Sequence, residues 1–428
     1  MEVRHFENID EKIYFETLEN GMQVYLMPKP GFNKTYATFT TRYGSIDHEF
    51  VPFGESVAKR VPDGIAHFLE HKLFEKEDYD VFSKFSENSA SSNAFTSFTR
   101  TCYLFSATSD LNKNLETLLD FVQSPYFTEE TVEKEKGIIE EEIKMYADNA
   151  DFKSYFGLLG NLYHNHPINI DIAGTVESIQ DITADLLHEC YNTFYHPSNM
   201  LLFVIGDFEP ESIMAQIKEN QDTKNYQPAP EIKRFLPDEP TDVATKERTV
   251  KMQTSSAKVL VGVKGIPDVQ ASKQELVKQE MTLEIICELL FGSSSEYYES
   301  LLDNHLANDT FSYEVTNESS FSFLMVGGDT TSPDELTASL WEKLLEVPRM
   351  TFIEDEFARI KKQKIGRFLS TLNSVEFIAN QFTEYAFNGM NLFEVLNVLE
   401  SLKLSDLHDI SKQYFDEKRI TVFTVLPE

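Results

Sequence analysis

Apolar and polar residues alternate in several short runs of the chain, and longer segments with helical spacing separate these runs. The strand-like runs occupy residues 21–27, 35–42, 258–263 and 321–327. A longer stretch, residues 127–146, places its apolar side chains at helical spacing. Because strands and helices alternate along the whole chain, the pattern predicts an α+β fold.

The pattern also repeats. A helical segment followed by an apolar strand closes each half: residues 182–187 lead to 199–206, and residues 404–410 lead to 419–425. The long helical segment of the first half has a counterpart in residues 352–369. We therefore expect an ancient duplication with two homologous domains, each a mostly antiparallel sheet with helices packed on one face.

A polar and charged stretch, residues 221–249, separates the two halves. This stretch contains four prolines: Pro228, Pro230, Pro237 and Pro240. Such a composition is typical of a linker. The expected division is an N-terminal domain of residues 1–220, a linker, and a C-terminal domain of residues 250–428.

Composition narrows the possible partners and the compartment. A net charge of −33 over 428 residues argues against nucleic acid and anionic lipid, and favours basic peptides, although a role in solubility explains the charge equally well. No apolar run opens the chain or is long enough to cross a membrane, so we expect neither a signal peptide nor a membrane segment. Cys102, Cys190 and Cys287 lack C-x-x-C spacing, which indicates free thiols in the cytoplasm.

The strongest chemical signal is the spacing H-x-x-E-H formed by His67, Glu70 and His71. On a helix, residues four apart share a face, so both imidazoles can reach one metal ion, with the carboxylate close by. This is the inverzincin signature of zinc hydrolases. The alternative is a surface helix with two solvated histidines. Apolar neighbours argue against it, since they predict a largely buried helix: Ile65, Ala66, Phe68, Leu69, Leu73 and Phe74.

A third ligand is expected from the helix predicted over residues 127–146, for which Thr128 is a plausible N-cap. Its apolar stripe consists of Val132, Ile138, Ile139, Ile143 and Tyr146. Glu135 and Glu142 fall within the stripe, and a carboxylate there is costly unless it meets a cation. The remaining acids are interpreted as a solvated face: Glu129, Glu130, Glu133, Glu140 and Glu141.

These residues give the chain a family resemblance. It resembles the pitrilysin/insulinase family of zinc peptidases, which includes the β subunit of the mitochondrial processing peptidase, and most of all the short bacterial members encoded beside a companion chain. The matching segments are residues 67–71, 92–97, 133–142, 172–179 and 194–207. Their order and spacing match over essentially the whole chain. The resemblance also implies two α+β domains that form half of a clamshell peptidase.

The resemblance implies a role for each residue of the predicted site. His67, His71 and Glu142 would ligate Zn²⁺, and Glu70 would be the general base. Glu135 would orient a ligand from outside the metal's own shell.

Residues 92–96 resemble the strand beside which the family's substrates lie as an added strand. Asn93, Ala94 and Phe95 would bind substrate through backbone groups. An alternative for Phe95, with Phe98, is a role in the core.

The second half lacks the metal motif. Aligning residues 72–74 with 289–291 places Glu284, Cys287 and Glu288 where His67, Glu70 and His71 stand, so one metal site per chain is expected.

The family often holds substrate and oxyanion with an Arg and a Tyr seven residues later. Leu302 stands at the Arg position, and Tyr313 can serve only with an insertion. A partner subunit would then supply the missing group. We therefore expect a dimer. A heterodimer that contains a homologous, metal-less companion is favoured over a homodimer.

Two function classes follow from the sequence. The first is a zinc-dependent endopeptidase that cleaves short or unfolded peptides as the catalytic subunit of a dimer. The second is a non-catalytic scaffold subunit of a processing complex. Retention of Glu70 together with His67, His71 and Glu142 favours the peptidase, because a scaffold does not need a general base.

Overall fold

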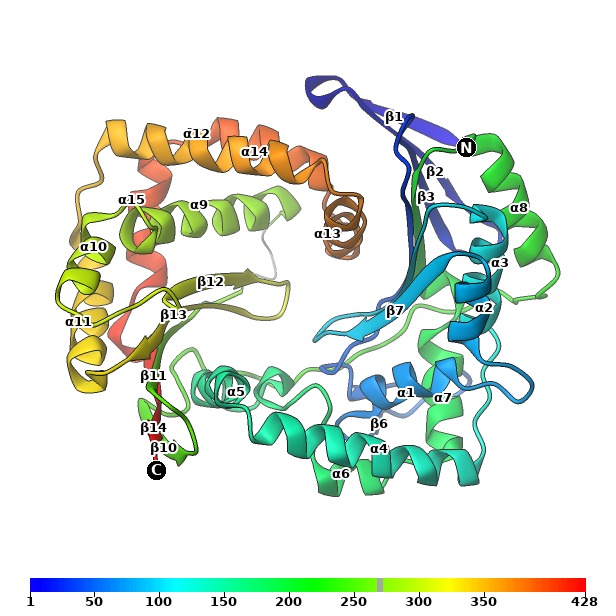
Figure 1. Ribbon diagram of the computed structural model, residues 1–428, viewed down its shortest axis with the longest axis horizontal. Helices are drawn as coiled ribbons and strands as arrows, with labels where there is room; N and C mark the ends of the chain where they lie inside the picture. Colours follow the sequence, from blue (N-terminus) through cyan, green and yellow to red (C-terminus); the bar gives the residue numbers. More distant parts are fainter. Residues whose placement is uncertain (268–271) are drawn as a thin grey trace. The chain divides into compact units, whose positions relative to one another are not determined.

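A computed structural model describes residues 1–267 and 272–428, and it divides these into two compact units (Figure 1). The first unit comprises residues 1–143, 171–236 and 372–387, and the second comprises residues 144–170, 237–371 and 388–428. Each unit is a mixed α/β structure around one main sheet, so the predicted α+β class is confirmed. The predicted ranges 1–220 and 250–428 describe repeated halves rather than compact units, and they stay a prediction.

The first unit is organised around a seven-stranded sheet in the order β1-β2-β3-β9-β4-β8-β7. Only β3 and β9 pair in parallel; the other neighbours are antiparallel. Its strands are β1 (Glu2–Phe6), β2 (Glu11–Thr17), β3 (Gln23–Pro28), β4 (Thr35–Thr41), β7 (Ala90–Thr96), β8 (Thr101–Ala107) and β9 (Met200–Gly206), with a separate pair β5 (Glu49–Phe50) and β6 (Lys59–Arg60). The helices are α1 (Ile65–Phe74), α2 (Val81–Glu87), α3 (Leu111–Val122), α4 (Glu129–Ala147), which continues into the second unit, α6 (Val176–Gln180), α7 (Ala184–Phe194), α8 (Pro210–Asp222) and α13 (Val375–Phe387).

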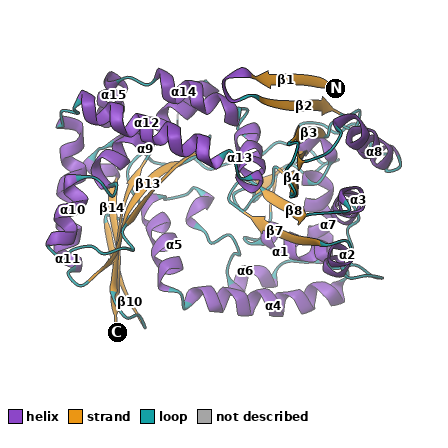
Figure 2. Ribbon diagram, turned by 45° about the horizontal axis from the view of Figure 1, so that its top comes forward, coloured by secondary structure: helices purple, strands orange, loops and turns teal. Residues whose placement is uncertain are grey.

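The second unit has a five-stranded sheet in the order β10-β14-β11-β13-β12. Figure 2 shows the strands in orange and the helices in purple. Its strands are β10 (Glu247–Met252), β11 (Ala257–Lys264), β12 (Ser312–Asn317), β13 (Ser322–Thr330) and β14 (Ile420–Pro427). Its helices are α5 (Ala150–Leu162), α9 (Lys273–Phe291), α10 (Glu296–Asp303), α11 (Pro333–Glu346), α12 (Glu354–Thr371), α14 (Val395–Ser401) and α15 (Leu404–Tyr414). Short 3₁₀ turns connect several of these elements, and no helix in the described residues is apolar over a length that could cross a bilayer.

Each sheet also receives a helix from the opposite half of the chain, which the sequence did not indicate. Helix α13, from the second half, packs on the first sheet, where the ring of Phe382 contacts Tyr25 and Phe203. Successive strand residues point to opposite faces, and the neighbours Val24 and Leu202 lie in the core with α1, α3 and α7. The first sheet is therefore covered on both faces. Helix α5, from the first half, packs on β11 and β14 of the second sheet in the same way.

Predicted strands and helices lie close to the observed ones, with one error in the stripe of α4. Thr128 accepts a hydrogen bond from the N–H of Thr131, as expected of an N-cap. Val132 and Ile139 are buried, but Ile138 is 49% exposed. Ile138 lies at the edge of the stripe, beyond Glu135 and Glu142, so the prediction that it faces inward was wrong.

The predicted linker divides between the two units near Pro237. Before it, the N–H of Phe235 donates to the carbonyl of Glu49 in the first unit. After it, the carboxylate of Glu239 accepts from three successive N–H groups, those of His164, Asn165 and His166, at 2.7–2.9 Å. The buried Lys264 ammonium lies 2.5 Å from the same carboxylate.

We predict that Glu239 stabilises the second unit in a pH-dependent way. Burial alone would raise the pKa of Glu239, but the Lys264 ammonium and the three N–H groups outweigh it and lower that pKa below its ordinary value. The stabilisation is then complete above the ordinary pKa of a glutamate and disappears as the pH falls through the lowered value. Glu239→Gln should lower the Tm at pH 7 by roughly 5 °C.

The measurement is thermal unfolding of the wild type and Glu239→Gln between pH 3 and pH 8. The two Tm curves should converge at the acidic end. A Tm difference that stays constant over the whole range would show that the carboxylate charge is not the stabilising feature.

Candidate metal centre

Backbone packing determines where the helix that carries the H-x-x-E-H motif begins. Gly64, the N-cap of α1, has a φ of +91°, and a Cβ there would lie 2.3 Å from the carbonyl oxygen of Ala173. Gly174 faces it with a φ of +77°, and its Cβ would lie 2.4 Å from the carbonyl oxygen of Asp63. The hydroxyl of Ser178 donates to that same carbonyl at 2.8 Å. Two turns thus touch backbone to backbone, which leaves room for glycine alone at both positions.

Helix α1 turns its apolar residues into the core and its histidines toward α4. The side chains of Phe68, Leu69 and Leu73 are fully buried. The rings of His67 and His71, one helical turn apart, have centroids 4.5 Å apart. The predicted burial of this helix is confirmed, so the alternative of a solvated surface helix does not hold.

Helix α4 brings Glu142 to both histidines. Its two carboxylate oxygens lie 3.8 Å from Nε2 of His67 and 3.5 Å from Nε2 of His71. One ligand atom from each of the three residues can be chosen so that all lie within 4.8 Å of one another, and in the described part of the chain no other three such side chains converge this way. Atoms that share a tetrahedral zinc ion stand roughly 3.4 Å apart. The spacing and the chemistry of the donors therefore fit zinc.

Glu135, two turns earlier on α4, contacts His71 from its other side. Its Oε1 lies 3.0 Å from Nδ1 of His71. With the proton on Nδ1 donated to this carboxylate, Nε2 presents its lone pair toward Glu142. This is the place expected for a residue that orients a metal ligand.

The two imidazoles have opposite electrostatic environments. Burial, together with the charge of His71, lowers the pKa of His67 to about 3, which keeps it neutral. Burial also opposes the charged form of His71, but the hydrogen bond to Glu135 and the carboxylates of Glu70 and Glu142 outweigh it and raise its pKa. A neutral imidazole among several carboxylates is a suitable environment for a divalent cation.

Glu70 is held by a hydroxyl from the neighbouring strand. Thr96, the last residue of β7, donates to Oε2 of Glu70 at 2.6 Å. Burial raises the pKa of Glu70, while this hydrogen bond acts in the opposite direction. Sequence reasoning missed the role of Thr96: it ends a segment that resembles the family, but nothing in the spacing shows that its hydroxyl reaches Glu70.

The predicted substrate-binding residues lie on β7, the last strand of its sheet. Asn93 is exposed and accepts from the N–H of Ala94 at 2.9 Å, and Ala94 packs against the core. Phe95 is half-buried, with the guanidinium of Arg100 5.9 Å from its ring centre. Among the described strands β7 pairs with β8 alone, so the backbone groups along its outer edge have no partner strand.

The second unit holds the other predicted residues. Tyr313 lies on β12, and its hydroxyl donates to Glu288 of α9. A hydroxyl has one proton, so in this arrangement Tyr313 cannot also donate to an oxyanion. Leu302, at the expected arginine position, is partly exposed on α10.

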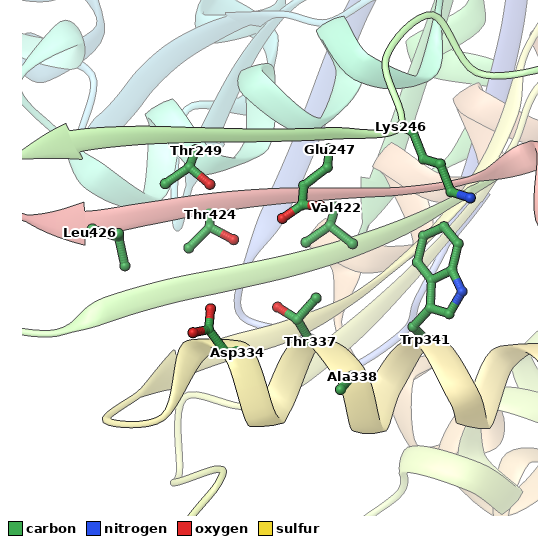
Figure 3. A pocket seen from close by; sticks show the side chains of 10 residues that line it. All are labelled: Lys246, Glu247, Thr249, Asp334, Thr337, Ala338, Trp341, Val422, Thr424 and Leu426. Atoms are coloured by element: carbon green, nitrogen blue, oxygen red, sulfur yellow. The ribbon is translucent and has the colours of Figure 1, made fainter.

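A separate cavity of about 490 Å³ lies in the second unit, between α11 and the β10–β14 face of the sheet (Figure 3). Trp341, the one tryptophan of the chain, lines it, and the Lys246 ammonium lies 5.0 Å from the ring centre. None of its lining residues belongs to the His67 cluster, so this cavity is not part of the candidate metal centre.

Comparisons with known proteins place the chain among zinc peptidases by sequence similarity. The family model "Insulinase (Peptidase family M16)" matches residues 50–176, and "Peptidase M16 inactive domain" matches residues 181–364. The Bacillus subtilis protein named "Uncharacterized zinc protease YmfH" is 54% identical over 99% of this chain and 98% of its own length. The zinc protease PqqE of Helicobacter pylori is 26% identical over 95% of this chain and 91% of its own length.

Solved structures share the fold. A crystal structure described as an M16-like peptidase from Alicyclobacillus acidocaldarius has a TM-score of 0.94 and 39% identity, and the match covers 98% of this chain and 99% of that one. A protease structure from Helicobacter pylori, with 22% identity, has a TM-score of 0.81 over 97% of this chain and all of that chain, which shows the same fold.

We predict that the turn at Gly174 is needed for a stable first unit. Gly174→Ala adds a Cβ at a positive φ and against the carbonyl of Asp63, so it should lower the Tm measurably, with a cost of about 2–4 kcal/mol. Gly137→Ala is the matched control, since Gly137 lies on an exposed part of α4 and a Cβ there meets nothing within 4 Å. Equal melting temperatures for the two variants would contradict the backbone contact.

We also predict that Glu135 and Glu142 of α4 affect zinc content to different degrees. Glu142→Gln removes a carboxylate from the ligand set and should abolish stoichiometric zinc, whereas Glu135→Gln should weaken zinc affinity roughly 10–100-fold. Glu141→Gln, a neighbour with an exposed side chain, is the control. Zinc per chain is measured by elemental analysis after dialysis, and full zinc retention by Glu142→Gln would exclude Glu142 as a ligand.

Proposed function

Because the chain belongs to the insulinase family of peptidases, M16, we propose that it is a zinc-dependent endopeptidase that cleaves short or unfolded peptides as the catalytic subunit of a dimer. The observation that carries this proposal is the convergence of His67, His71 and Glu142, with Glu70 held beside them by Thr96. Two imidazoles, a carboxylate ligand and a second carboxylate near them are the groups that metal-assisted peptide hydrolysis needs.

In this proposal, His67, His71 and Glu142 hold the metal, and Glu135 keeps His71 in the required tautomer. Zinc bound there would polarise the peptide carbonyl and lower the pKa of a water molecule. Glu70 would act as the general base, accepting a proton from the attacking water and passing it to the leaving amine. The raised pKa of Glu70 suits it to both transfers, and the hydrogen bond from Thr96 limits the rotation of its carboxylate.

Substrate would add a strand to the open edge of β7, with backbone bonds to Asn93, Ala94 and Phe95. Such binding uses hydrogen bonds to the main chain of the substrate. These groups are free only in a peptide that is short or unfolded. The net charge of −33 favours basic sequences. Free, buried cysteines support a cytoplasmic location: Cys102, Cys190 and Cys287.

A companion subunit would complete the active site. Leu302 replaces the expected arginine, and the hydroxyl proton of Tyr313 is directed to Glu288. The lack of an arginine and of a free tyrosine hydroxyl proton favours a homologous, metal-less chain as the partner. A second copy of the same chain is the alternative.

The second candidate function is a scaffold subunit without catalysis. The observation in its favour is that residues 181–364 match the model of the inactive M16 domain. Residues 50–176, however, retain Glu70 together with His67, His71 and Glu142, and this complete set favours a catalytic role for the first half of the chain.

The test is cleavage of a quenched-fluorescent basic peptide by the wild type and Glu70→Gln, each with and without the companion chain. Glu70→Gln should lose roughly 10²–10⁴-fold in kcat while it keeps stoichiometric zinc, because the general base is lost but no ligand is. Glu77→Gln, in the loop after α1, serves as a control with unchanged activity.

If Glu70→Gln cleaves the peptide as fast as the wild type, the mechanism is refuted. Zinc-loaded wild type that cleaves no peptide in any combination would favour the scaffold function instead. Activity in the pair but not in the single chain would support a companion that completes the site.

A further inference from the structure

The second unit repeats the sheet that carries the metal centre. The order β3-β9-β4-β8-β7 in the first unit corresponds to β10-β14-β11-β13-β12 in the second. In both, the first pair of strands is parallel and the other three are antiparallel. Helix α1 packs against the last strand β7, and helix α9 packs against the last strand β12. Helix α9 therefore occupies the place of the metal-binding helix.

The correspondence extends to single residues. Helix α1 ends at Phe74, and helix α9 ends at Phe291, the residue aligned with it in the sequence. Counting back from these ends, Glu284 and Glu288 stand at the positions of the two histidines. They are four residues apart and so share one helical face, as the histidines do.

A lysine reaches this face from the neighbouring helix. Helix α12 packs on α9, and Nζ of Lys364 lies 2.8 Å from Oε2 of Glu284 and 3.9 Å from Oε2 of Glu288. Gln363 donates to the other oxygen of Glu288 at 3.2 Å, and the hydroxyl of Tyr313 donates to Oε2. In the first unit, the hydroxyl of Thr96 on β7 contacts Glu70 of α1 in a comparable way.

Burial makes a cation necessary at this place. The side chain of Glu288 is 5% exposed and that of Lys364 is 11% exposed. Glu284, one turn earlier, is 32% exposed, and two carboxylates this close repel each other unless a positive charge lies between them. In the first unit the carboxylates surround a group of ligand atoms suited to a metal; in the second they surround an ammonium group.

We propose that the Lys364 ammonium is a built-in cation at the second unit's equivalent of the metal centre, and that its removal turns the surrounding carboxylates into a divalent-cation site. The ligands then available are carboxylate, amide and phenol oxygens from Glu284, Glu288, Gln363 and Tyr313. Oxygen donors of this kind suit a hard cation such as Mn²⁺. The inference rests on the geometry of the second unit and is independent of peptidase activity.

The experiment uses the full-length, zinc-loaded chain and compares the wild type with Lys364→Ala, Lys364→Arg and the control Lys362→Ala, an exposed residue of the same helix. Lys364→Ala should lower the Tm by roughly 5 °C, because it leaves a buried carboxylate without its cation. It should also bind one more Mn²⁺ per chain than the wild type, counted by electron paramagnetic resonance, and regain stability as Mn²⁺ is added. Lys364→Arg and Lys362→Ala should match the wild type in Tm and bind no additional Mn²⁺.

A wild-type Tm for Lys364→Ala, or no Mn²⁺ beyond that of the wild type, overturns the proposal and leaves an ordinary ion pair. If Lys364→Ala does not fold, the double variant Lys364→Ala/Glu284→Gln provides the second test, because it removes one of the two repelling charges. It should fold and bind no additional Mn²⁺. A double variant that is as unstable as the single one also overturns the proposal.

Discussion

Both units depend on the cost of holding carboxylates and imidazoles together in a partly buried place. A positive charge at its centre stabilises such a cluster. In the first unit, Glu142 and Glu135 approach two histidines whose free nitrogens converge, an arrangement that suits a metal ion. In the second, Glu284 and Glu288 approach the ammonium of Lys364. Equivalent helices and an equivalent edge strand in the two units thus meet one electrostatic requirement with two different chemical groups.

The packing around α1 determines where its histidines lie relative to α4. The contact between the turns at Gly64 and Gly174 positions the first residue of the helix, and the buried side chains of Phe68 and Leu73 determine its rotation. A helix that is held at its start and along its core face cannot turn its histidines away from α4. Thr96 adds the third constraint, since its hydroxyl links Glu70 to the strand at which substrate is proposed to bind.

Exchange of helices makes each sheet dependent on both halves of the chain. Helix α13 covers the first sheet through Phe382, and α5 covers the second, where Gly157 lies against the ring of Phe423. Strand β9 is buried along its whole length for this reason. A duplicated half therefore lacks part of its own core, and its apolar sheet face needs the other half.

The sequence by itself determined the fold class, the repeat, the motif of His67, Glu70 and His71, and the inward direction of Glu135 and Glu142. These follow from periodicity and from the cost of a buried charge, which act over one or two helical turns and can be read from local spacing. The tertiary structure alone decided that Thr96 reaches Glu70, that Lys364 reaches Glu284, and that α5 and α13 exchange sheets. Each of these contacts joins segments far apart in the chain, and which distant groups meet depends on how whole helices and sheets pack, which no local pattern encodes.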